Sequence, residues 1–148
     1  MNKLLMEQFE DCPVVAAVKD EEGLTACIDS EIGIVFVLFG DICSISGIVK
    51  RLKDAGKTVI VHLDLISGLS GKEIAVTFIR NTTDADGIIS TKPALIRQAK
   101  ECNLFTVMRF FAIDSMAFDN IRKQYHTVQP DVVEILPGLM PKIITKVS

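Results

Sequence analysis

Short runs of aliphatic and β-branched residues alternate along this chain with longer segments in which apolar and charged positions recur at helical spacing. Each apolar run has the length and composition of a buried strand. Six such runs are present, at residues 13–18, 32–39, 58–65, 85–91, 104–113 and 131–137. Strands that alternate with helices form βαβ units, so the pattern predicts an α/β domain with a parallel sheet.

The segment 41–57 is the clearest of the predicted helices. Asp41 stands at its start as a candidate cap, and Gly56 ends it. Its apolar positions form one face, made of Ile45, Ile48, Val49 and Leu52. Further helices are predicted at 21–30, 72–82, 92–103 and 114–125, and the segment 140–148 predicts the start of a sixth.

The six predicted strands fit either an open doubly wound sheet or most of a (β/α)8 barrel. Neither a GxGxxG nor a GxxxxGK[ST] pattern follows a predicted strand, which argues against dinucleotide-binding and P-loop folds. No linker or low-complexity tract divides the chain, so we expect one domain over residues 1–148.

The composition is that of a soluble globular protein. Of the 148 residues, 49% are hydrophobic and 6% aromatic, so the core is aliphatic. The net charge of −3 gives no overall sign of nucleic-acid binding. The first residues lack the apolar run of a signal peptide, and no run approaches the roughly 18 apolar residues of a membrane span. No CxxC pair is present, so we expect a cytoplasmic protein without a metal site, with mostly buried, reduced thiols at Cys12, Cys27, Cys43 and Cys102.

Polar side chains interrupt the apolar runs near their carboxyl ends, where parallel α/β folds bind ligands. In the run TVIVHLDL, His62 and Asp64 are two residues apart, which places both side chains on one face of a strand. The later runs carry Ser90, Lys92, Arg109, Glu134 and Gly138 near their ends. We therefore expect these residues to gather at one edge of the sheet.

The sequence leaves two interpretations of this group open. Buried charges need partners, so one interpretation is a structural ion network of His62, Asp64, Arg109 and Glu134. The other is a pocket for a small anionic ligand. Polar residues that start helices are equally caps or ligand contacts, as for Asp41, Asp114 and Ser115. A nucleophilic triad is not indicated, because no activated Ser or Cys accompanies His62.

Four segments together carry a family resemblance, namely GKTVIVHLDLISGLSG, ADGIISTKPALIRQAK, RFFAIDSMAFDN and PDVVEILPGLMPKII. In this order and spacing they resemble the glycerol uptake operon antiterminator family, from about Cys12 to the last residue. The resemblance implies a parallel (β/α) TIM-barrel-like fold with about six βα units present. Members of the family continue through a seventh strand, a Gly-Gly loop and an eighth strand, so we expect this chain to be incomplete at its carboxyl end.

The resemblance also implies a regulatory protein rather than an enzyme. Such proteins resemble sensors of glycerol 3-phosphate that act on the leader mRNA of glycerol-utilisation genes and let polymerase pass a terminator, without a cofactor. Soluble barrels of this kind often form homodimers. The ligand-binding residues that the resemblance suggests are His62, Asp64, Ser90, Lys92, Arg109 and Glu134, with Gly138 at the end of the last strand.

The sequence is compatible with two alternatives to the regulator. One is a phosphate-binding-barrel enzyme that acts on a small phosphorylated metabolite, with His62 and Asp64 as acid and base. The other is a scaffold-like barrel that binds neither ligand nor RNA and associates through an exposed sheet edge. The RNA role rests on resemblance alone, because the basic helix positions lack aromatic neighbours for base stacking.

Overall fold

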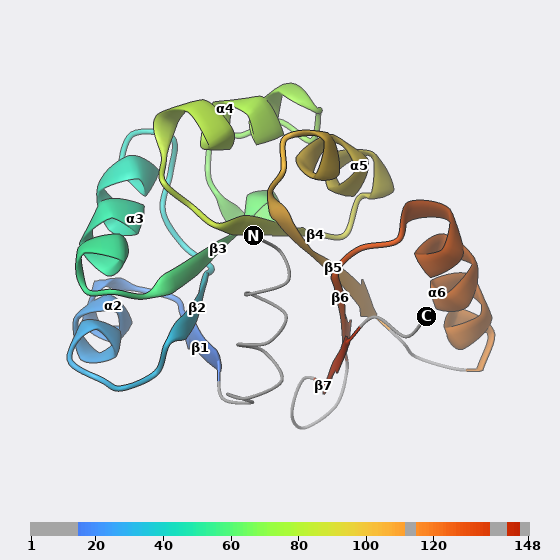
Figure 1. Ribbon diagram of the computed structural model, residues 1–148, viewed down its shortest axis with the longest axis horizontal. Helices are drawn as coiled ribbons and strands as arrows, with labels where there is room; N and C mark the ends of the chain where they lie inside the picture. The colour runs from blue at the N-terminus through green and yellow to red at the C-terminus, as the bar shows by residue number, and fades with distance from the viewer. Residues whose placement is uncertain (1–14, 112–114, 137–141, 146–148) are drawn as a thin grey trace.

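The computed structural model describes residues 15–111, 115–136 and 142–145, which form one seven-stranded sheet (Figure 1). The strands are neighbours in chain order, and the first six are parallel. They are β1 (Val15–Val18), β2 (Ile34–Val37), β3 (Thr58–His62), β4 (Gly87–Ser90), β5 (Phe105–Phe111), β6 (Val132–Leu136) and the antiparallel β7 (Lys142–Thr145).

All described helices lie on the convex side of the curled sheet (Figure 1). They are α2 (Glu21–Ile28), α3 (Ile45–Asp54), α4 (Ile74–Thr82), α5 (Pro93–Glu101) and α6 (Ser115–Val128), with a 3-10 turn, η1 (Leu63–Leu65), after β3. A doubly wound sheet would carry helices on both faces. The arrangement is instead a curled half-barrel, which confirms the TIM-barrel-like prediction.

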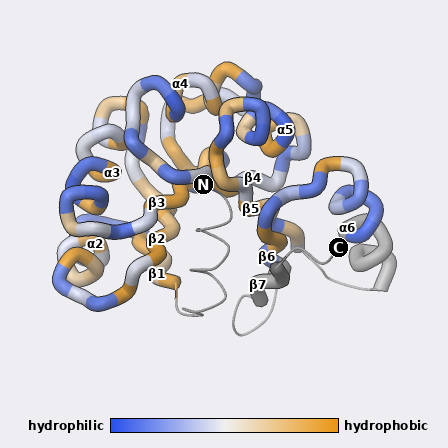
Figure 2. The backbone as a smooth tube through the Cα atoms, in the orientation of Figure 1, coloured by the Kyte–Doolittle hydropathy of each residue, from blue (hydrophilic) through white to orange (hydrophobic). Residues whose placement is uncertain are grey.

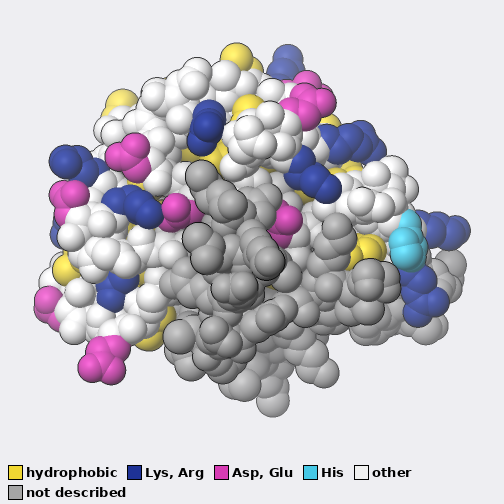
Figure 3. All heavy atoms as spheres, in the orientation of Figure 1, with side chains coloured by type: hydrophobic (Ala, Val, Ile, Leu, Met, Phe, Trp, Pro, Cys, Tyr) yellow, Lys and Arg dark blue, Asp and Glu magenta, His cyan; other side chains and the backbone are white. Residues whose placement is uncertain are grey.

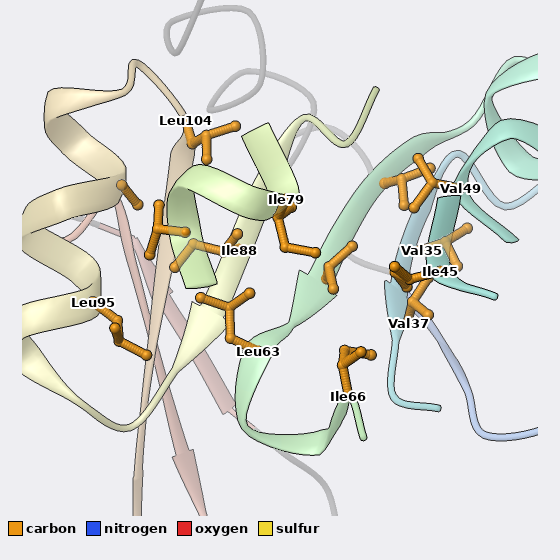
Figure 4. Close-up of a cluster of buried hydrophobic side chains, with 14 of the residues drawn as sticks. Val35, Val37, Ile45, Val49, Leu63, Ile66, Ile79, Ile88, Leu95 and Leu104 are labelled. Atoms are coloured by element: carbon orange, nitrogen blue, oxygen red, sulfur yellow. The ribbon is translucent and has the colours of Figure 1, made fainter. Parts of the chain in front are cut away.

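Two apolar clusters lie on opposite faces of the sheet. The outer cluster fills the space between strands and helices, where Ile79 of α4, Ile88 of β4 and Leu95 of α5 lie together (Figure 4). The inner cluster lines the concave face and comprises Ile34, Phe36, Ile60, Ile89, Phe105, Val107 and Val132. Since both faces are buried, the strands are apolar at nearly every position (Figure 2).

Aspartates tie the amino ends of neighbouring strands together. Asp86, just before β4, accepts hydrogen bonds from the backbone N–H of Val59 in β3 at 2.9 Å and from the Lys53 ammonium at 2.8 Å. Asp131, just before β6, accepts from the backbone N–H of Thr106 in β5 at 2.9 Å and from its hydroxyl at 3.0 Å. Polar groups at this end of the sheet therefore serve stability.

Two of the predicted secondary-structure elements differ from the structure. The strand predicted at 58–65 ends at His62, because residues Leu63–Leu65 turn into η1. The expected sixth helix is not formed at Lys142–Thr145, which pairs with β6 as a strand. The remainder of that predicted helix lies outside the described residues.

The described cysteines are all free thiols, but they differ in exposure. Cys27 is buried, Cys102 is partly buried and Cys43 is exposed. The prediction of buried thiols is therefore wrong for Cys43, and Cys12 lies outside the described residues. None of the helices in the described ranges combines the length and apolar character needed to cross a bilayer.

Candidate functional site

Strand register places three of the predicted polar residues on the concave face: His62 at the carboxyl end of β3, Arg109 in the carboxyl-terminal half of β5 and Glu134 in the middle of β6. His62 pairs with Ile89, and Ile89 pairs with Val107, so His62 shares the face of the inner apolar cluster. Arg109 lies two residues after Val107 on β5 and pairs with Glu134 on β6. A polar layer therefore lies directly beyond the apolar inner layer.

Arg109 and Glu134 form a buried ion pair in which the guanidinium Nε donates to the carboxylate Oε1. The side chains are only 13% and 3% exposed. Placing either charge alone at this depth would be costly, so each residue requires the other. The pair anchors a cation at the strand ends.

His62 lies on the same face of the sheet, within electrostatic reach of Arg109, and is itself 2% exposed. Burial, followed by the positive charge of Arg109, lowers the pKa of His62 to about 4, although Asp64 acts in the opposite direction. The imidazole is therefore neutral near pH 7. Among the described residues, its Nδ1 is the buried side-chain atom that lacks a hydrogen-bond partner, an unsatisfied state that proteins seldom tolerate without a reason.

Asp64, in η1, connects the end of β3 to the end of β4. Its Oδ1 accepts from the Ser90 hydroxyl at 2.9 Å, and its Oδ2 accepts from the Thr91 backbone N–H at 2.9 Å and hydroxyl at 2.8 Å. Burial alone would raise the pKa of Asp64, but these hydrogen bonds together lower it below its usual value. The carboxylate is therefore ionised and fixed in orientation.

Lys92 brings a second cation to the same edge. Its ammonium lies 3.9 Å from Asp64 Oδ1, and the side chain is 49% exposed. The ammonium also rests on the loop after β3, because a Cβ added to Gly71 would lie only 2.7 Å from Nζ. Lys92 is thus a loosely held, solvent-accessible charge, in contrast to the buried Arg109.

The expected residues therefore form two bonded groups, and the charges of Arg109 and Asp64, one from each group, both act on His62. The His62–Asp64 relationship was predicted from a shared strand face; this is wrong, because the strand ends at His62 and Asp64 lies in the turn that follows. Thr91 was not among the predicted site residues, although it stands between Ser90 and Lys92 at the end of β4. Gly138 lies outside the described residues.

The aspartate that follows β2 is a cap. Asp41 accepts from the backbone N–H groups of Cys43 at 2.9 Å and Ser44 at 2.8 Å, in the turn that precedes α3. Asp114 lies outside the described residues, and Ser115 is the first residue of α6. Within the described ranges, no three His, Cys, Asp or Glu side chains gather as metal ligands would.

The strand ends thus present two cations, two carboxylates, one neutral imidazole and two hydroxyls. Such a set suits an anion that also carries hydroxyl groups, since cations meet the anion and the remaining groups meet hydroxyls. The Ser90 hydroxyl donates to Asp64 and accepts from the Lys92 backbone N–H at 3.0 Å, so it is held as a structural link rather than beside a base.

Comparison with known proteins gives the family. The sequence profile described as glycerol-3-phosphate responsive antiterminator matches residues 14–148. The chain belongs to this family. It is 46% identical over 140 residues to the uncharacterized protein YgcP of Escherichia coli (strain K12), a match that covers 95% of this chain and 73% of YgcP.

Two crystal structures share both sequence and fold with this chain. A glycerol uptake operon antiterminator-related protein of Thermotoga maritima is 40% identical with a TM-score of 0.76, over 84% of this chain and 70% of that protein. The glycerol uptake operon antiterminator regulatory protein of Listeria monocytogenes is 29% identical with a TM-score of 0.80, over 85% of this chain and 68% of that protein. The resemblance found in the sequence is confirmed, and the family is one of regulators rather than enzymes.

Proposed function

We propose that this antiterminator-family protein binds glycerol 3-phosphate at the carboxyl ends of β3–β6 and, in response, acts on leader mRNA so that transcription passes a terminator. The observation that carries the ligand site is the largely buried Arg109, held by Glu134 on the same face of the sheet as His62, whose buried Nδ1 lacks a hydrogen-bond partner. The residues proposed to bind the ligand are His62, Asp64, Ser90, Lys92, Arg109, Glu134 and Gly138, to which we add Thr91.

The two ends of glycerol 3-phosphate match different parts of this edge. Its phosphate is a dianion near pH 7 and is met by the ammonium of Lys92 and the guanidinium of Arg109. Its hydroxyls need neutral or acceptor groups, which His62 and Asp64 supply. A ligand hydroxyl on His62 Nδ1 would satisfy the one buried atom that lacks a partner among the described residues.

Family membership supports the RNA step, which we place in the cytoplasm, where leader transcripts are made. Binding of the dianionic ligand adds negative charge at the strand ends, beside Lys92 and Arg109. A change of this kind alters RNA affinity only if the ligand-bound and ligand-free forms differ in their RNA contacts. Ligand-dependent RNA binding is therefore the property to measure.

Titration calorimetry tests the sensing half of the proposal. Glycerol 3-phosphate is expected to bind, whereas glycerol and inorganic phosphate, each offering half of the ligand, bind much more weakly. The variant Lys92→Met removes a cation without burying anything new, so it should stay folded and bind at least tenfold more weakly, because charge-assisted contacts are worth roughly 1.5–3 kcal/mol. Absence of heat from the folded wild-type protein with glycerol 3-phosphate would remove the proposal.

Filter binding tests the RNA half. Leader RNA of a glycerol-utilisation operon is titrated with the protein in the presence and in the absence of glycerol 3-phosphate. We expect the affinity to differ between the two series. Identical curves would show that RNA binding, if present, is not under ligand control.

A further inference from the structure

We infer that the outer face of α5 and α6 is the surface that contacts the RNA phosphate backbone. The inference rests on the proposed function, and it assigns a place to the RNA. The residues proposed to meet phosphates are Arg97 on α5 with Arg122 and Lys123 on α6, all of which are exposed.

The cations of α3 are a useful contrast, because they are already neutralised. Lys50 pairs with Asp54 at 3.6 Å and Arg51 with Glu21 at 2.8 Å. Lys53 pairs with Asp86 at 2.8 Å at the amino end of the sheet. Figure 3 shows the result over α2 and α3, where Lys and Arg side chains are interspersed with Asp and Glu. This face therefore offers little net positive charge to RNA.

The cations of α5 and α6 are arranged differently. Of the ion pairs formed among the described residues, none involves Arg97, Arg122 or Lys123. Figure 3 shows Lys and Arg side chains gathered over these two helices. Together α5 and α6 contain four basic residues (Lys or Arg) and two acidic residues (Asp or Glu). This balance is positive in a chain whose net charge is −3. Concentration of positive charge on one face is the footprint of a nucleic-acid backbone contact.

Lys100 fixes the position of α5 relative to α6. Its ammonium donates to the backbone carbonyl of Gln129 at 2.6 Å and of Val128 at 3.4 Å, which joins α5 to the carboxyl end of α6. The cations on the two helices are thus held on a rigid pair of helices, as a preorganised phosphate surface requires. Tyr125 packs against the outer apolar cluster, so this face offers charge rather than base stacking.

The position of this face separates it from the ligand site. The ligand site opens on the concave side at the strand ends, whereas α5 and α6 cover the convex side (Figure 1). Arg109 lies near the carboxyl end of β5, the strand that precedes α6 along the chain. RNA and glycerol 3-phosphate can therefore be bound at the same time, and the shortest covalent route between the two sites runs from Lys92 directly into α5.

The test compares two sets of charge-removing variants in filter binding to leader RNA over a range of salt concentrations. The variant R97Q/R122Q/K123Q should lose at least tenfold in affinity at low salt. Each lost phosphate contact lowers the slope of log affinity against log salt by about 0.7 for a single strand, so the slope should fall by about 2. The matched control K50Q/R51Q, on the neutralised α3 face, should bind RNA as the wild type does.

Calorimetry with glycerol 3-phosphate shows whether the triple variant is folded, because unchanged ligand binding requires an intact concave site. If the wild type binds RNA and the folded triple variant binds it equally well with the same salt slope, RNA does not contact the α5–α6 surface. The proposed function would still stand in that case. If the wild type binds no leader RNA with or without glycerol 3-phosphate, the proposed function itself fails and this surface fails with it.

Discussion

Arg109 on β5 and Glu134 on β6 occupy paired positions in the sheet, and the buried guanidinium of one donates to the buried carboxylate of the other. Such a pair serves two purposes that experiments can separate. Each charge makes the other tolerable in the interior, and together they hold a cation at the proposed ligand site.

Removal of one partner should be more damaging than removal of both. Glu134→Gln leaves the guanidinium of Arg109 buried without a counter-charge, so we expect a loss of about 3 kcal/mol in the free energy of unfolding, measured by urea denaturation. The double variant R109M/E134L replaces the pair by apolar groups and should recover most of that loss. It should nevertheless fail to bind glycerol 3-phosphate in calorimetry, whereas retained binding would make the pair purely structural.

The buried imidazole of His62 predicts a specific pH dependence. Its pKa is about 4 in the folded protein and near 6.5 when unfolded, so between these values the unfolded state binds more protons. The free energy of unfolding is therefore unaffected by His62 above pH 6.5 and decreases as the pH falls towards 4. The total decrease from this residue is about 3 kcal/mol.

Urea denaturation at several pH values measures this effect. The variant His62→Gln should show a shallower loss of stability than the wild type between pH 6.5 and 4. His126→Gln, at an exposed position on α6, is the matched control and should keep the wild-type dependence. Parallel curves for the wild type and His62→Gln would contradict the prediction. Asp64 contributes below this window, because, despite its burial, the hydrogen bonds from Thr91 and Ser90 hold its pKa below its usual value.

Even the isosteric substitution Asp64→Asn should destabilise the protein. In Asp64→Asn an amide NH2 replaces one carboxylate oxygen, so one of the groups on Ser90 and Thr91 loses its acceptor. An unsatisfied buried donor costs about 2 kcal/mol, and a thermal melt should show the loss. Asp41→Asn is the matched control: asparagine caps an exposed turn as well as aspartate does, so its melting temperature should not change. Equal melting temperatures for both variants would contradict this account.

Gly71 offers a way to disturb Lys92 without touching its charge. The Cβ of Gly71→Ala would fall 2.7 Å from Lys92 Nζ, and the flexible end of that side chain can move away. We expect an unchanged free energy of unfolding and a several-fold change in the affinity for glycerol 3-phosphate, measured by calorimetry. Gly47→Ala in α3 meets nothing within 4 Å and should stabilise the helix by about 0.5–1 kcal/mol with unchanged ligand affinity.

The sequence predicted the parallel strands and the helices between them because both carry strong local signals. The helix at 41–57 shows how far such signals reach: Gly56, with φ +80°, ends it as predicted, but α3 begins only at Ile45 because Asp41 caps a preceding turn. Boundaries depend on which backbone N–H a side chain reaches, and composition does not record that. The same limit hid the end of β3 at His62.

The clustering of the candidate site residues was predictable from the sequence, but the bonds between them were not. Parallel strands bring their carboxyl ends together, so polar residues at those ends must be neighbours. Which of them bond to one another depends on register. Arg109 and Glu134 meet because their positions are paired across β5 and β6, whereas Asp64 is carried by η1 to Ser90 and Thr91. Thr91 was missed because one of its two hydrogen bonds to Asp64 is donated by its backbone N–H, and a backbone bond leaves no signal in the sequence.

The chain-order arrangement of the strands has a consequence for how the protein is made. Because each strand pairs with its successor, no pairing among the parallel strands joins residues more than 27 positions apart, the separation of His62 and Ile89. Every strand added as the chain emerges from the ribosome therefore meets a partner that has already been synthesised. Assembly can proceed one unit at a time from the amino end, with little entropy lost in closing each loop.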